Sequence, residues 1–182
     1  MTEAKEIDVL YTKEDLSKMD FTGRLRAQLV KRNYSIAEGD LSRPWGGFFR
    51  ISDKQSASFI AQFFPGVNLP RSTEGATLSP KFLIVEAGKK LSWQVHARRA
   101  EFWRVLRGPV AVYRSKTDEQ PDEPKIFNNG ETIDLPVGTR HRLAGLDGRG
   151  VVAEIWIHTN PKKPSDETDI RRIADDFGRQ RK

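Results

Sequence analysis

The chain has 182 residues, which is enough for one domain with a sizeable core and too few for two ordinary domains. Charged residues make up 31% and hydrophobic residues 37%, which is typical of globular proteins and excludes collagen-like or disordered chains. The absence of cysteine excludes disulfides, thiolate nucleophiles and cysteine zinc sites. No apolar run approaches the roughly 20 residues that cross a bilayer, and the acidic N-terminus is unlike a signal peptide, so we expect a cytoplasmic protein. The net charge of +6 favours an anionic partner without naming one.

The first 40 residues are predicted to form a charged helical extension, and residues 41–182 to form one domain. Thr12 and Asp15 have the spacing of a capping box, and Leu16 and Met19 follow at helical spacing. Further helices are predicted at 53–64 and at 165–177, and the arginines of the second are expected to face solvent. Residues 65–81 contain proline, glycine and serine, which indicates a loop that covers a site or only decorates the surface.

From residue 43 onward, short apolar segments alternate with glycine and proline. This spacing predicts strands at 45–51, 82–86, 91–96, 101–106, 110–114, 125–127, 132–135 and 151–158, with another beginning at His141. Turn signals recur at the interval of a sandwich or barrel. The sequence therefore predicts a mainly β barrel with helices at both ends and one inserted helix.

Two short stretches bring together side chains that suit a metal ion. If 91–96 is a strand, Gln94 and His96 share one face, and Glu101 begins the next strand after a short turn. His141 follows a tight Pro-x-Gly turn and starts another strand. A set of amide, imidazole and carboxylate donors suits Zn, Mn, Fe, Co or Ni. A single strand histidine is more often a packing residue, which is our expectation for His158, but the joint spacing favours a metal site.

The spacing of these residues resembles the two cupin motifs. Five residues separate Gly88 from Gln94, six separate Glu101 from Gly108, and Gly130 opens a second motif that ends at His141. More narrowly, RPWGG at 43–47, the lysine at 81, LSWQVHARRAEFW at 91–103, HRL at 141–143 and DIRRIADDFGR at 169–179 resemble the type II mannose-6-phosphate isomerase cupin. That cupin forms the C-terminal half of bifunctional mannose-1-phosphate guanylyltransferase/isomerases and also occurs alone.

The resemblance implies a cupin/jelly-roll barrel that holds one divalent ion, with Zn favoured, and that isomerises a phosphosugar. Arg99 and Arg142 stand beside ligands, where they are expected to stabilise oxyanion charge or grip phosphate. Glu154 takes the place of the family's last-strand acid and is the predicted base. The expected substrate-binding residues are Lys81, Arg43 and Arg98, the last standing where the family usually has histidine.

Several alternatives remain open at this stage. Mannose-6-phosphate and fructose-6-phosphate are the favoured pair, and the sequence leaves open a related ketose–aldose pair such as a heptose phosphate. The second class of function is a non-catalytic protein with the same barrel, which binds a sugar or sugar phosphate but has lost the catalytic base. The net positive charge alone does not support nucleic-acid binding, because the sequence has no motif in which aromatic and basic residues alternate. We expect a small phosphosugar as partner, no nucleic acid or membrane, and, by resemblance, a homodimer.

Overall fold

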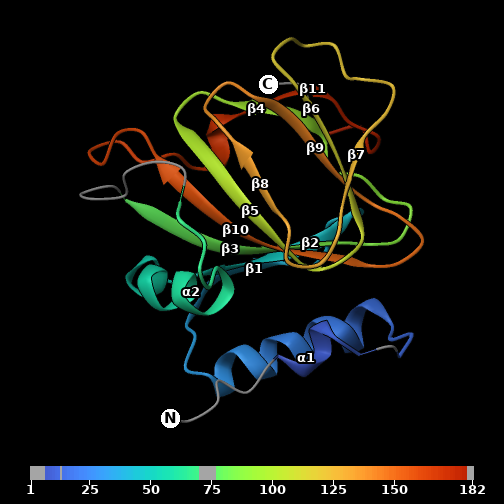
Figure 1. The fold of residues 1–182 in the computed structure, drawn as a ribbon, viewed down its shortest axis with the longest axis vertical. Coiled ribbons are helices and arrows are strands. Elements are labelled where there is room, and N and C mark those ends of the chain that lie inside the picture. Colours follow the sequence, from blue (N-terminus) through green and yellow to red (C-terminus); the bar gives the residue numbers. More distant parts are fainter. Residues whose placement is uncertain (1–6, 13, 70–76, 180–182) are drawn as a thin grey trace.

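Two antiparallel β-sheets face each other in the computed structural model, which describes residues 7–12, 14–69 and 77–179 (Figure 1). The larger sheet has the order β1 (Ile36–Asp40), β2 (Gly46–Ile51), β3 (Leu78–Val85), β10 (Gly150–His158), β5 (Arg99–Arg107) and β8 (Thr132–Leu135). The smaller sheet has the order β11 (Ile170–Ala174), β4 (Trp93–His96), β9 (Arg140–Gly145), β6 (Val110–Ser115) and β7 (Lys125–Phe127). The predicted mainly β fold is confirmed.

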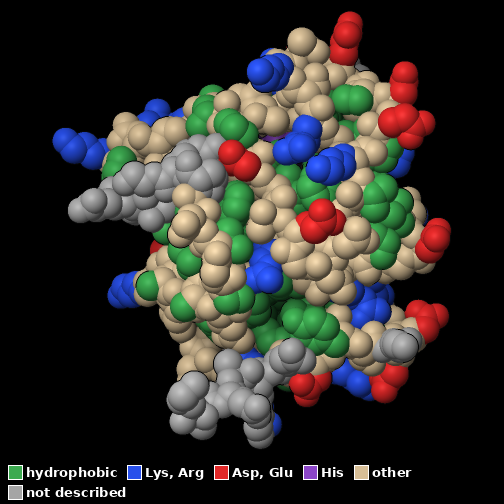
Figure 2. Space-filling model, viewed as in Figure 1, with side chains coloured by type: hydrophobic (Ala, Val, Ile, Leu, Met, Phe, Trp, Pro, Cys, Tyr) green, Lys and Arg blue, Asp and Glu red, His purple; other side chains and the backbone are tan. Residues whose placement is uncertain are grey.

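The six-stranded sheet is apolar on both faces, because one face lines the barrel and the other is covered by helices. On β3, Leu83 and Val85 join the barrel core with Trp103, while Phe82 and Ile84 belong to a second core on the outer face. That second core contains side chains from α1 (Lys18–Lys31) and α2 (Ser56–Phe63). Figure 1 shows both helices beneath this sheet, and Figure 2 shows hydrophobic side chains at the junction between α1 and the barrel.

The N-terminal helix and the inserted helix are confirmed, with one shifted boundary. The helix α1 begins after Ser17, not after Thr12: the amide of Asp20 donates to Ser17 Oγ at 3.1 Å, and Ser17 Oγ donates back to the carboxylate of Asp20. A second Ser/Asp pair with capping-box spacing therefore forms the cap. The inserted segment forms a 3₁₀ turn, Asp53–Gln55, followed by α2. No helix in the described ranges is long and apolar enough to cross a membrane.

The predicted helix at 165–177 is wrong. A single 3₁₀ turn, Glu167–Asp169, is followed by the strand β11, which pairs antiparallel with β4. Alternation explains the strand, since Ile170 is buried and Arg171 is exposed on the opposite face. The predicted loop at 65–81 also ends earlier than expected, because β3 already begins at Leu78; residues 70–76 of that prediction lie outside the described residues.

Candidate metal centre

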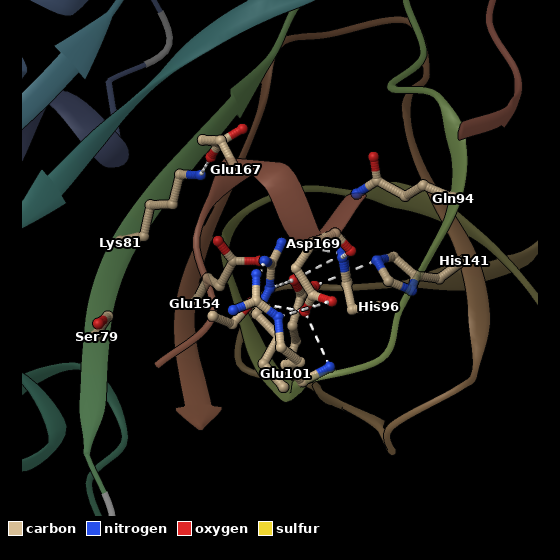
Figure 3. Close-up of polar contacts among 12 residues, drawn as sticks. Ser79, Lys81, Gln94, His96, Glu101, His141, Glu154, Glu167 and Asp169 are labelled. Carbon is tan, nitrogen blue, oxygen red and sulfur yellow. Dashed lines mark hydrogen bonds and ion pairs between the residues drawn. The ribbon is translucent and has the colours of Figure 1, made fainter. Parts of the chain in front are cut away.

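Three of the four predicted ligands converge inside the barrel, one from each of three strands. His96 ends β4, Glu101 lies in β5 and His141 lies in β9, and their ligand atoms all lie within 4.8 Å of one another. The Nε2 atom of His96 is 3.1 Å from Glu101 Oε1, and that of His141 is 3.2 Å from Glu101 Oε2 (Figure 3). Each residue is only 2% exposed, so these side chains are shielded from bulk solvent.

The hydrogen bonds to the far sides of both imidazoles determine which ring nitrogen is free. Nδ1 of His96 donates to the backbone carbonyl of Asp169 at 3.3 Å, and Nδ1 of His141 donates to that of Thr139 at 3.0 Å. Since a carbonyl only accepts, Nδ1 of each ring carries a hydrogen, and the neutral form of each ring leaves its lone pair on Nε2, which faces Glu101. Such backbone partners are the usual means of orienting metal-binding histidines.

With a neutral His141 ring, His141 Nε2 and Glu101 Oε2 are two acceptors facing each other, an arrangement that a cation satisfies. Burial, the largest influence, lowers the pKa of His96, which favours the neutral ring. Burial raises the pKa of Glu101, but His96, Arg99 and His141 lower it further, so the carboxylate remains ionised. His141 Nε2 and Glu101 Oε2 are buried without a hydrogen-bond partner among the described residues. The three side chains can therefore hold a divalent metal ion.

Gln94, the fourth predicted ligand, is adjacent to this cluster. Its Cα is paired with that of His141 across β4 and β9, and its side chain lines the same cavity as Glu101. Figure 3 shows its amide on the side that carries the two imidazoles. The amide oxygen accepts a hydrogen bond from Ser92 Oγ at 2.7 Å. Coordination of a metal ion by Gln94 stays a prediction, because its amide oxygen already accepts the hydrogen bond from Ser92 Oγ.

Arg99 lies directly against two of the three ligands, His96 and Glu101, as its position in the sequence indicated. Its Nε donates to Glu101 Oε1 at 2.8 Å, and a terminal nitrogen lies 3.1 Å from Nε2 of His96. The other terminal nitrogen donates to Ser165 Oγ, and the guanidinium carbon lies 3.8 Å from the ring centroid of Trp156. Arg99 is 2% exposed and thus a fixed positive charge next to the cluster.

Glu154 is a second buried carboxyl beside the same site. It lies in β10, with its Cα paired with Trp103 on one side and Lys81 on the other. Trp103 Nε1 donates to its Oε1 at 2.9 Å, while Oε2 has no hydrogen-bond partner among the described residues. Burial first, and then the charge of Glu101, raise the pKa of Glu154 to about 8. The carboxyl is therefore protonated at neutral pH and able to exchange a proton just above it.

A cavity of about 40 Å³ opens next to these carboxyls, and Lys81 and Arg43 line it as predicted. The Nζ atom of Lys81 lies 4.1 Å from the ring centroid of Phe48 and 4.5 Å from that of Trp156, and it pairs with Glu167 at 3.4 Å. Such aromatic faces stabilise a partly desolvated ammonium. The cavity therefore lies between the metal-binding cluster and the cationic side chains of Lys81 and Arg43.

Arg98 and Arg142, by contrast, do not line this cavity. Arg98 donates to the Pro164 carbonyl and to Asp166, both in the C-terminal segment. Arg142 donates to the Leu91 carbonyl at 2.6 Å and pairs with Asp176. Both arginines thus fasten the C-terminal segment to the barrel in this structure.

Sequence reasoning missed the residues that the C-terminal segment brings to the cavity, namely Glu167, Arg172 and Arg179. The expectation that both arginines of 171–172 face solvent is correct for Arg171 only, since Arg172 is half-buried. The available signal was the pattern Ile170-Arg-Arg-Ile173, because period-two alternation sends adjacent arginines to opposite faces of a strand.

Comparisons with known proteins identify the family of the chain. Residues 65–175 match the family described as mannose-6-phosphate isomerase C-terminal. The chain is 26% identical over 154 residues to a mannose-1-phosphate guanylyltransferase of Salmonella montevideo, covering 85% of this chain and 26% of that protein. It is also 26% identical over 167 residues to the xanthan biosynthesis protein XanB of Xanthomonas campestris, covering 92% of this chain and 28% of that protein. The chain thus spans about a quarter of the length of these relatives.

Solved structures with similar folds include a cupin 2 conserved barrel domain protein of Salinispora arenicola, with a TM-score of 0.44 and 18% identity over 68% of this chain and 83% of that one. Another is the vicilin of Corylus avellana, with a TM-score of 0.49 and 12% identity over 73% of this chain and 35% of that one. The family match covers more than half of the chain and includes every member of the cluster of His96, Glu101 and His141. The chain therefore belongs to the mannose-6-phosphate isomerase C-terminal family.

Proposed function

We propose that the chain is a metal-dependent phosphosugar isomerase that interconverts mannose-6-phosphate and fructose-6-phosphate. The observation that carries this proposal is the convergence of two oriented imidazoles and one carboxylate next to a second, protonatable carboxyl, Glu154. Two histidines and one carboxylate are a donor set of catalytic zinc sites, so we favour Zn²⁺ over Mn, Fe, Co or Ni. The family match and the relatives named for mannose-1-phosphate chemistry support this substrate class.

Aldose–ketose isomerisation moves one proton from C2 of the aldose to C1, while the hydroxyl proton of O2 passes to O1. A bound divalent ion would polarise the oxygens on C1 and C2 and so acidify the C2 hydrogen. Glu154 is assigned the carbon-bound proton: its ionised form, the minority at neutral pH because the pKa is about 8, takes the proton from C2 and returns it to C1. Arg99 supplies fixed positive charge against oxygens that become negative during the transfer.

The present cavity is too small for a hexose phosphate, since about 40 Å³ corresponds to little more than one water molecule. Substrate entry therefore requires side chains at its mouth to separate. Lys81 and Glu167 form one such contact between β3 and the C-terminal segment. Glu167 is 41% exposed, so its carboxylate can move into solvent, while the rings of Phe48 and Trp156 still face the Lys81 ammonium.

The test combines metal analysis with a turnover assay. Purified full-length protein should contain about one equivalent of divalent metal, and His96→Ala should lose it. Interconversion of mannose-6-phosphate and fructose-6-phosphate should then depend on that metal and disappear in Glu154→Gln, which keeps the shape of the side chain. Wild-type protein that binds no divalent ion, or that turns over at full rate after metal removal, would refute the proposal.

The raised pKa of Glu154, which leaves the assigned base mostly protonated at neutral pH, also favours a second candidate, a phosphosugar-binding module that does not catalyse isomerisation. The same assay separates the two, because a module binds mannose-6-phosphate in equilibrium titrations without producing fructose-6-phosphate. A panel that includes a heptose phosphate identifies the substrate if another phosphosugar is turned over instead.

A further inference from the structure

Positive charge dominates the lining of the cavity beside the metal-binding cluster. Its described lining has five cationic side chains and three carboxyls. The cations are Arg43, Lys81, Arg99, Arg172 and Arg179. The cavity therefore has an excess of positive charge that the lining itself does not neutralise.

Most of these cations already have an acidic partner. Arg99 pairs with Glu101 and Lys81 with Glu167. The other two pairs join Arg179 to Asp175 and Arg43 to Asp40.

Arg172 differs from the other four cations. No ion pair or hydrogen bond joins its side chain to any residue of the described ranges, and its Nε is fully buried. The Nε of Arg43 is also buried without an aligned hydrogen bond, but it lies 2.8 Å from the Asp40 carboxylate. Burying a guanidinium nitrogen without an acceptor is unfavourable, so Arg172 in particular indicates a missing anion.

The position of Arg172 in the sheet relates this missing anion to the metal-binding cluster. Its Cα is paired with that of Gln94 in β4, and Gln94 is paired with His141 in β9. Three side chains therefore stand in one row across β11, β4 and β9. Two strand spacings separate Arg172 from His141, or about 10 Å between their Cα atoms. This span is comparable to the length of an open-chain hexose phosphate, from its reacting carbons to its phosphate.

We propose, resting on the phosphosugar function above, that Arg172 forms the phosphate subsite of this cavity, with Arg43 and Arg179 beside it. A guanidinium offers a fork of donors that matches two phosphate oxygens, and the neighbouring positive charges strengthen the attraction. Burial and the charges of Arg179 and Arg43 lower the pKa of Arg172, against the opposite influence of Glu167 and Asp175. A bound phosphate dianion relieves the repulsion among the three arginines. The C-terminal strand then contributes directly to substrate recognition.

The neighbouring residue supplies a matched control. Arg171 has the same side chain on the same strand, but it pairs with Asp118 at 2.8 Å on the outside of the barrel. We compare Arg172→Ala and Arg172→Gln with Arg171→Ala in the full-length, metal-loaded protein. Metal content and melting temperature of each variant show whether the fold and the metal-binding cluster are intact.

Equilibrium titration with inorganic phosphate and with mannose-6-phosphate tests the subsite. Both variants of Arg172 should weaken the binding of each ligand at least tenfold, while Arg171→Ala stays within about twofold of wild type. Free mannose, which has no phosphate, should bind equally to all variants. Unchanged phosphate affinity in the Arg172 variants, an equal loss in Arg171→Ala, or no phosphate binding by wild type would overturn the subsite.

Kinetics distinguish failure of the subsite from failure of the proposed isomerase. If wild type binds mannose-6-phosphate through Arg172 without turnover, the subsite stands and the isomerase function fails. If wild type turns over and the Arg172 variants keep the wild-type KM, the subsite fails and the isomerase function stands. If both are correct, the variants raise KM with a smaller change in kcat, because the phosphate is remote from the reacting carbons.

Discussion

The backbone carbonyl of Asp169 accepts a hydrogen bond from Nδ1 of His96 at 3.3 Å, and it joins the C-terminal segment to the metal-binding cluster. The carboxylate of the same residue accepts from the backbone amides of Ala97 and Arg98 at 3.1 and 3.0 Å. Ser165 Oγ donates to it at 2.7 Å. Asp169 therefore holds the turn after His96 with its side chain and orients the imidazole with its backbone.

Replacing Asp169 with alanine should weaken metal binding although the residue is not a ligand. Loss of three hydrogen bonds to a charged group frees the turn after His96, and we expect the free energy of unfolding to fall by about 2–4 kcal/mol. Metal affinity should drop about tenfold or more, as for other residues that orient ligands. Chemical denaturation and competition with a chelating dye measure the two effects.

The exposed Asp122 provides the control, because its replacement by alanine should change neither quantity. Burial raises the pKa of Asp169, but hydrogen bonds from Ser165, Arg98 and Ala97 lower it to a value below the usual range. The stabilisation from this carboxylate is therefore present above its unfolded pKa and is lost as the pH falls through its folded pKa. A variant Asp169→Ala with wild-type stability and metal affinity would contradict this role.

His158 should be essential to stability and dispensable for metal binding. The amide of Ser165 donates to its Nδ1 at 2.8 Å, so Nε2 carries the hydrogen and donates to Ser79 Oγ at 2.9 Å. Replacing His158 with alanine leaves a buried cavity and two unsatisfied groups, with an expected loss of about 2–4 kcal/mol in stability. Metal stoichiometry should remain at the wild-type value, whereas His141→Ala should abolish it. Loss of metal from a folded His158→Ala protein would place this histidine in the site.

Glu154 should make the metal-free protein less stable in alkaline solution. Its pKa is about 8 when folded, against an ordinary value of 4.5, so the folded chain binds this proton more tightly than the unfolded chain. The proton on Glu154 therefore stabilises the folded chain at low pH, and this stabilisation is lost as the pH rises through about 8. Between pH 7 and 9 the wild type should lose about 1 kcal/mol of stability relative to Glu154→Gln.

Thermal melts of both proteins in a chelating buffer across this interval measure the difference. The interval lies above the usual pKa of histidine, so His96 and His158, whose pKa values are lowered, stay neutral throughout. Parallel melting curves for wild type and Glu154→Gln would show that Glu154 is already ionised at neutral pH.

The strands of the barrel were predictable because their signals are local. The bounds of β7 and β8 agree with the prediction to the residue, since each is a short alternating segment between turns. The strand β1, with the sequence IAEGD, was not predicted, because it is polar, contains glycine and is mostly exposed at the sheet edge. The strand β11 comes shortly after Ser165 and Asp166, residue types that favour the start of a helix. Only the pairing of this segment with β4 makes it a strand.

The site shows the same division between local and long-range information. Motif spacing identified His96, Glu101 and His141, because each follows a turn of defined length. It did not identify the carbonyl of Asp169 that orients His96, because 73 residues separate the two in the chain. Arg172 was missed for a related reason, since which face of β11 lines the cavity depends on pairing with β4.

Removing the acid at the mouth of the cavity should strengthen phosphate binding. Glu167 pairs with Lys81 at 3.4 Å, and its negative charge also acts on Arg172. Glu167→Gln keeps the side-chain size and removes a charge that repels an incoming phosphate, so the affinity for inorganic phosphate should rise about two- to tenfold. The gain should shrink as the salt concentration increases, because Glu167 is partly exposed and its charge is screened. Titrations at two ionic strengths measure it, with the exposed Glu123→Gln as control. An unchanged or weaker affinity in Glu167→Gln would mean that phosphate does not approach Lys81 and Arg172.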